Sequence, residues 1–295
     1  MRTGYLAFDG AVLGIALGQY THREELEFRT YLTSEPAQKD RLAGLLLFSR
    51  VEIDALEPLA RSWQPGDSPG TSSPLVCWPA VRERLASRVP GSLVEFKPWR
   101  IRFYEPGSSE LVVYRIPNNS ELPLLKIELV PLLLMTLIRR SSLVVHAAGV
   151  NIGGHGLAIA GPSGVGKSTA ARLLGGHLLS DDIVAITNVR SHPELRGTTL
   201  GGCTDGDAPC PLRAILFPHK SDEFRIARLE PRAALCRFLR EHSCYLFDTM
   251  GDTKALTMHV VGDLFDRVPA FELHFPLARL DVGAVLDTVL SATHC

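Results

Sequence analysis

The segment GPSGVGKST, Gly161 to Thr169, contains the residue types that hold a phosphate. It fits the pattern G-x-x-x-x-G-K-S, in which glycines let backbone N–H groups close around phosphate oxygens. The apolar run LAIAG precedes it and STAARLL follows it, which predicts the strand, loop and helix that this site requires. The predicted ATP-binding residues are Gly161, Pro162, Ser163, Gly164, Val165, Gly166, Lys167, Ser168 and Thr169. Lys167 is expected to reach the β- and γ-phosphates, and the Ser168 hydroxyl to ligate Mg²⁺.

Two adjacent acids, Asp181 and Asp182, follow the segment HLLS after this helix. If HLLS returns as a parallel strand, its C-terminal end lies beside the phosphate loop. One carboxylate there can accept a hydroxyl proton and the other can orient a metal or water. We assign Asp181 as the general base and Asp182, with Ser168, as the Mg²⁺ ligand. The two roles can be exchanged, and a solvated acidic turn is the alternative without chemistry.

The elements that must position these residues alternate between strands and helices. An apolar helix is expected from Leu124 to Arg139 and Arg140, followed by SLVVHAAGV, the phosphate loop with its helix, and LLSDDIVAI. This alternation predicts an α/β domain over residues 121–295. Residues 1–120 are interpreted as a smaller mixed α/β domain, a candidate for substrate recruitment.

Within residues 1–120 the expected strands include GYLAF, GAVLGIAL and EFRTYLT, and a helix is expected from about Gln38 because leucines recur at helical spacing. The segment QPGDSPGTSSP predicts a surface loop. After it, SLVEFKPWRIRFYEP and SELVVYRIP are expected to form one strand each.

His146-Ala-Ala-Gly-Val150, GLAIAGPSGVGKST and LLSDDIVAI, in this order, resemble the catalytic domain of HPr kinase/phosphorylase and its kinase-only relatives. That family shares its fold with phosphoenolpyruvate carboxykinase and phosphorylates serine in a protein or peptide. Some relatives act on precursor peptides in peptide-biosynthesis clusters. The resemblance covers about residues 140–190 and is weaker toward the C-terminus. It implies a P-loop kinase domain, with His146 as an active-site histidine near the phosphates.

The resemblance implies an ATP-dependent, Mg²⁺-requiring kinase that acts on a serine of a small protein or precursor peptide. The bifunctional members carry a signature around E-[IL]-R-G, but here Glu194-Leu-Arg-Gly197 has unmatched flanking residues, so phosphorylase activity is not expected. Two alternatives stay open: a kinase for a small hydroxylated metabolite, and an ATP-binding regulatory protein without catalysis. A homo-oligomer also stays open.

Several further polar residues have both a functional and a structural interpretation. Arg213 and Lys220, in PLRAILFPHK, can supply positive charge to the transferring phosphoryl group or to the acidic end of a peptide, or they can be solvated charges at strand ends. His146 can be a buried core histidine instead of a site residue, and His155 is interpreted as an exposed turn residue.

Composition and charge exclude some classes of partner. Lys plus Arg is 31 against 32 for Asp plus Glu, so no global field draws this chain of 295 residues to nucleic acid or membrane. The apolar run Leu129 to Ile138 is too short to cross a bilayer, and no signal peptide is recognised, so a cytoplasmic protein is expected. The 6 cysteines predict ordinary thiols, including the pair Cys203 and Cys210.

Overall fold

The computed structural model describes the strands named below for residues 2–115, and then residues 124–201, 208–246 and 253–292. Side chains are described for residues 129–131, 133–201, 208–242 and 253–292. The chain divides into two compact units, Met1–Leu132 and Leu133–Cys295. Each unit is described by itself.

The first unit contains a six-stranded sheet with the order β1-β2-β3-β6-β5-β4. Its strands are β1 (Arg2–Phe8), β2 (Ala11–Leu17), β3 (Leu42–Arg50), β4 (Leu93–Lys97), β5 (Arg100–Tyr104) and β6 (Glu110–Arg115). β3 pairs in parallel with β2 on one side and with β6 on the other, and the remaining pairs are antiparallel.

Two expectations for this sheet are wrong. The leucines assigned to a helix after Gln38 belong to β3. A strand between two parallel neighbours is commonly apolar throughout, so its leucines match helical spacing as well. The single strand expected over SLVEFKPWRIRFYEP is instead the antiparallel pair β4 and β5. The strand expected at EFRTYLT, the loop from Gln64 to Pro74 and the helices implied by a mixed α/β domain lie outside the described residues.

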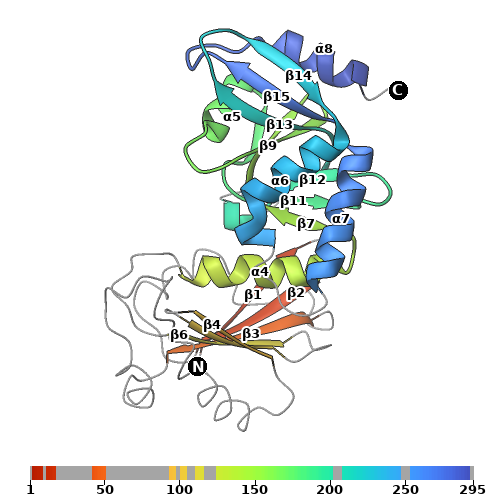
Figure 1. Cartoon of the computed structure of the whole chain (residues 1–295). Helices are drawn as coiled ribbons and strands as arrows, with labels where there is room; N and C mark the ends of the chain where they lie inside the picture. Colours follow the sequence, from red (N-terminus) through yellow and green to blue (C-terminus); the bar gives the residue numbers. More distant parts are fainter. Residues whose placement is uncertain are drawn as a thin grey trace, which may run out of the picture. The chain divides into compact units, whose positions relative to one another are not determined.

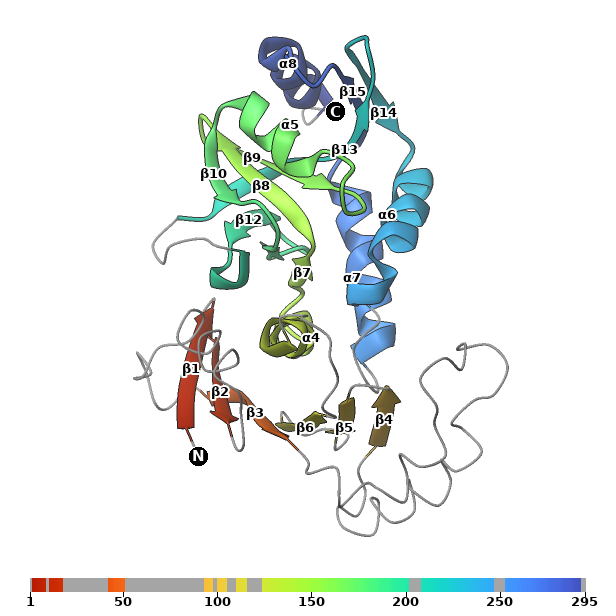
Figure 2. The same cartoon turned by 90° about the vertical axis from the view of Figure 1, so that its left-hand side faces the viewer.

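The second unit is an α/β structure with a mixed sheet, as the alternation of elements predicted. The sheet follows the order β10-β8-β9-β13-β12-β11-β7, and β15 pairs with both β13 and β14 (Figure 1 and Figure 2). β9 and β13 pair in parallel, as do β13 and β15, whereas the other pairs are antiparallel. The strands are β7 (Leu143–Val145), β8 (Ala147–Ile152), β9 (His155–Ala160), β10 (His177–Ser180), β11 (Val184–Thr187), β12 (Glu194–Gly197), β13 (Cys210–Lys220), β14 (Arg225–Leu229) and β15 (Ala270–Phe275).

β7 and β8 are separated by one residue, His146, yet they pair with different strands. β7 pairs with β11, whereas β8 pairs with β9 and β10. The segment SLVVHAAGV, which predicted one strand, therefore forms two strands with His146 at the joint between them.

Helices cover both faces of this sheet. On β13 and β15, Leu216, Phe271 and Phe275 share a buried apolar cluster with residues of α5 (Lys167–Leu174) and α8 (Val282–Ala292). The neighbouring residue Phe217 points to the opposite face, where Arg237 of α6 (Pro231–Leu246) lies over its ring. α6 and α7 (Thr253–Arg267) lie side by side in both views (Figure 2).

Among the described residues, α4 (Leu124–Ile138) agrees with the apolar helix expected from Leu124. Across the described part of the chain, the helices lack the combination of length and apolarity that a membrane span requires.

Candidate functional site

The phosphate loop connects β9 to α5, as the motif predicted. β9 ends at Ala160 and α5 begins at Lys167. Gly164 and Gly166 have φ values of 78° and 109°. A side chain at either position would be strained in this left-handed region, so the loop requires glycine there.

Lys167 is buried at the first turn of α5, with 7% of its surface exposed. Its Nζ donates hydrogen bonds to the carbonyl oxygens of Gly161 (2.9 Å) and Pro162 (3.1 Å). Burial lowers the pKa of Lys167, while the carboxylates of Asp182 and Glu241 oppose that shift. The ammonium group is therefore held by the loop itself and lies close to two acids.

The chain turns sharply at the acid pair, and Ser180 holds this turn. Its Oγ accepts hydrogen bonds from the backbone N–H of Asp182 (3.2 Å) and Ile183 (3.1 Å), and donates to the carbonyl of Gly201 (2.9 Å). A methyl group at Gly201 would collide with Ser180 Oγ and with the backbone of Ile183, so only glycine fits here. Nothing in the sequence pattern singled out Ser180 or Gly201, because Gly201 is distant along the chain.

Because of this turn, both acids face the same pocket, which two successive strand residues would not do. The Asp181 side chain is exposed. The Asp182 carboxylate lies 3.0 Å from Nε2 of His146, at the joint between β7 and β8. Ser168 Oγ lies 3.5 Å from the backbone carbonyl oxygen of Asp181.

The strand before the acids, β10, reaches the phosphate loop by way of β8. β10 is antiparallel to β8, which is itself antiparallel to β9. Two antiparallel steps give β10 the same direction as β9, so its C-terminal end still lies at the edge that carries the phosphate loop. β10 therefore runs parallel to β9 as expected, although β8 lies between the two strands.

The pocket has a volume of about 370 Å³ and gathers most of the predicted residues. It is lined by His146, Ser163, Gly164, Gly166, Lys167, Ser168, Thr169, Asp181, Asp182, Lys220 and Leu277. Gly161, Pro162 and Val165 are outside this lining, although the first two accept hydrogen bonds from Lys167. Ser168 and Asp182 place a hydroxyl and a carboxylate in the pocket, and such oxygen donors suit Mg²⁺.

The other polar residues considered for the site, Lys220, Arg213 and Glu194, lie in different parts of the unit. Lys220, at the end of β13, lines the pocket. Arg213, near the start of the same strand, does not, and its Nε lies 3.4 Å from Nδ1 of His155. Glu194 is also outside the lining and accepts a hydrogen bond from Asn188 (3.1 Å).

The cysteine pair can be followed only in part, because Cys203 lies outside the described residues. Cys210 is a buried free thiol at the start of β13. Burial, aided by the charge of Glu194, raises the pKa of the Cys210 thiol to about 11, so the thiol is protonated at neutral pH.

A network around Arg237 borders the phosphate loop, and no sequence motif predicted it. Arg237 Nε donates to Oε1 of Glu241 (3.0 Å), and its other nitrogens bond Oε1 of Glu272 (2.7 Å) and Nε2 of His219 (2.8 Å). Oε2 of Glu241 is buried and has no hydrogen-bond partner in the described part of the chain. A methyl group at Gly161 would lie 3.7 Å from this oxygen.

His219, Glu272 and His274 offer ligand atoms within 4.8 Å of one another, a spacing that a metal ion can use. Arg237 and Arg225 hydrogen-bond Nε2 of His219 (2.8 Å) and His274 (3.0 Å). Arginine is only a donor, so both ring nitrogens accept these bonds. Burial and the charge of Arg237 lower the pKa of His219, which favours the same neutral form. The arrangement is therefore an arginine-bridged network.

Comparisons with known proteins do not extend the assignment. No protein-family model and no curated protein matches the sequence.

Proposed function

We propose that the chain is an ATP-dependent, Mg²⁺-requiring kinase that transfers the γ-phosphoryl group to a serine of a small protein or peptide. The observation that carries this proposal is the gathering of Lys167, Ser168, Asp181, Asp182 and His146 around one pocket. A phosphate loop alone is common to many nucleotide-binding proteins. A carboxylate beside it supplies the base that transfer to a hydroxyl requires.

In this proposal, Asp181 accepts the proton of the serine hydroxyl, because its exposed carboxylate is open to an incoming acceptor. The serine oxygen forms a bond to the γ-phosphorus while the bond from that phosphorus to the bridging oxygen breaks, and ADP leaves. The ammonium groups of Lys167 and Lys220 offset the negative charge of the transferring group.

Asp182 and Ser168 are the residues that would hold Mg²⁺, which supplies charge neutralisation to the phosphates when bound. His146 contacts the Asp182 carboxylate at 3.0 Å, and metal-binding carboxylates commonly have such a hydrogen-bonded partner. His146 is thus assigned to positioning Asp182. The P-loop kinase fold and the likeness to HPr kinase/phosphorylase remain part of the proposal.

The test is incubation of the protein with γ-labelled ATP, Mg²⁺ and three groups of acceptors: serine peptides, the same peptides with alanine, and free hydroxylated metabolites. Label on the serine peptides alone supports the proposal. Label on the free metabolites would instead favour the metabolite kinase. ATP binding without any transfer would favour the regulatory alternative and contradict the proposal. The matched control is the double variant Asp181→Asn/Asp182→Asn.

A further inference from the structure

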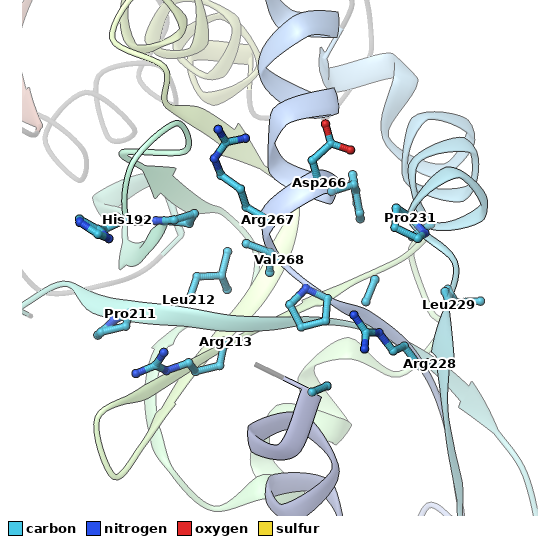
Figure 3. Close-up of a pocket in the computed structure, with 16 residues that line it drawn as sticks. His192, Pro211, Leu212, Arg213, Arg228, Leu229, Pro231, Asp266, Arg267 and Val268 are labelled. Atoms are coloured by element: carbon cyan, nitrogen blue, oxygen red, sulfur yellow. The ribbon is translucent and has the colours of Figure 1, made fainter. Parts of the chain in front are cut away.

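A second pocket, of about 640 Å³, lies at the opposite end of β13 from the phosphate loop. Its lining includes Leu212 and Arg213 near the start of β13, Ala270 at the start of β15, and Arg228 and Leu229 at the end of β14. In Figure 3, Arg213 and Arg228 lie beside these strands, and Asp266 and Arg267 lie at the end of α7. The volume is within the range of sites that bind ligands.

The wall of this pocket combines an apolar floor with excess positive charge. Leu212, Phe265, Val268 and Ala270 form its almost completely buried base, and Pro211, Leu229 and Pro231 add apolar surface that is half-buried or exposed. Three arginines, Arg213, Arg228 and Arg267, share the lining with one carboxylate, that of Asp266. The chain as a whole has a net charge of -1, so the positive charge of this lining is local.

Two of the arginines have no carboxylate partner among the side chains that the structure describes. Arg213 contacts His155 through Nε (3.4 Å), and neither Arg213 nor Arg228 forms an ion pair with a carboxylate among the residues described. Arg267 differs, because its Nη1 lies 4.0 Å from the carboxylate of Asp263 and also donates to the backbone carbonyl of that residue (3.2 Å). Two guanidinium groups on neighbouring parts of the sheet are thus available to a ligand. Guanidinium groups form strong, directional hydrogen bonds with carboxylates.

We propose that this pocket docks an acidic, partly apolar segment of the polypeptide that receives the phosphate. The inference rests on the proposed kinase function. The pocket beside the phosphate loop is polar, and its single large apolar side chain, Leu277, is 54% exposed. ATP occupies that pocket in the proposed reaction, which leaves little apolar surface there to bind a peptide. The second pocket supplies the missing apolar contact together with charge complementarity.

The fold sets the spacing between the docked segment and the serine. β13 separates the two pockets, since Leu212 lines one and Lys220 lines the other. A strand rises about 3.3 Å per residue, so this span is roughly 26 Å. An extended peptide therefore needs roughly eight residues between its docked acidic part and the serine.

Binding is tested without ATP, by fluorescence anisotropy of a dye-labelled synthetic peptide in which glutamate and leucine alternate with glycine. We expect Arg213→Gln/Arg228→Gln to weaken binding about tenfold or more, because two charge-assisted contacts are lost. Arg240→Gln, which removes an exposed arginine of α6 outside the pocket, is the matched control and should bind like wild type. Equal binding by wild type and the double variant would overturn the docking site. So would equally strong binding of the glutamine analogue of the peptide, or complete displacement by inorganic phosphate alone.

Charge reversal covers the case in which the double variant fails to fold. Arg228→Glu changes an exposed residue and should prefer a lysine and leucine peptide over the glutamate peptide. An unchanged preference would contradict the proposal. In the kinase assay, the double variant should raise KM for a serine peptide that carries the acidic segment and leave KM for the same peptide without it unchanged. Peptide binding without phosphoryl transfer would refute the kinase function alone, whereas transfer unaffected by the double variant would refute the docking site alone.

Discussion

The ammonium group of Lys167 hydrogen-bonds carbonyl oxygens at the start of its own loop, and Lys167 also lines the pocket. We expect Lys167→Ala to lower kcat/KM by roughly two to three orders of magnitude, since a preorganised positive charge at the phosphates is lost. Initial rates with γ-labelled ATP give this value, and circular dichroism checks the fold. Arg172→Gln, which changes an exposed residue of the same helix, should retain activity. Transfer by Lys167→Ala near the wild-type rate would contradict the role given to the lysine.

Asp181 and Asp182 are adjacent, but their surroundings differ. Asp181 is exposed, whereas Asp182 contacts His146. Asp181→Asn should therefore lower kcat by roughly two to four orders of magnitude with ATP affinity nearly unchanged. Asp182→Asn should mainly weaken the Mg²⁺-dependent part of ATP binding. Steady-state kinetics and ATP titrations with and without Mg²⁺ separate the two effects. If the effects are exchanged, so are the roles, and a double variant that still transfers phosphate would refute the mechanism.

The turn after β10 is held by one side chain, because the Ser180 hydroxyl hydrogen-bonds three backbone groups. Ser180→Ala would leave the N–H groups of Asp182 and Ile183 and the carbonyl of Gly201 without this partner. We expect a loss of about 1–3 kcal/mol in the free energy of unfolding and a lower rate of transfer, since the acids lose their support. Chemical denaturation and initial rates measure both. Ser191→Ala is the control, because Ser191 is exposed and its Oγ makes a long hydrogen bond of 3.4 Å to the carbonyl oxygen of Asn188. A wild-type rate in Ser180→Ala would show that the turn does not depend on this hydroxyl.

At the scale of the second unit, His242 of α6 makes the free energy of unfolding depend on pH. It is 1% exposed, stacks on Phe238 and lies 3.1 Å from the carbonyl oxygen of His146. Burial lowers the pKa of His242 from 6.5 to about 4. Between these values the unfolded chain binds a proton that the folded chain does not, so stability is complete above pH 6.5 and falls as the pH drops toward 4. The contribution is about 3 kcal/mol.

Urea denaturation at a series of pH values measures this loss. In His242→Asn the part of the slope that belongs to this ring should disappear, even though the variant is less stable at every pH. An unchanged slope would assign the pH dependence to other groups.

The sequence predicted those features of the fold and the site that depend on residues close together in the chain. The phosphate loop, its flanking strand and helix, and the position of the acid pair depend on short segments, and the structure places them in one pocket. It did not predict Glu241, which approaches Gly161 of the loop from α6, or Arg237, which hydrogen-bonds Glu241. The error at β3 has a similar origin, because its pairing with β2 and β6 cannot be read from its own leucines.

The joint at His146 also determines where the chain can accept an inserted residue. An extra residue between Val145 and His146 would shift β8 against both β9 and β10 while β7 stays paired with β11, and each side chain of β8 would exchange faces. The exposed turn at Gly153 and Gly154, which joins β8 to β9, has open space around both residues. An added loop there leaves every strand register in place. Natural insertions and engineered reporter segments are therefore to be expected at this turn and not at the joint.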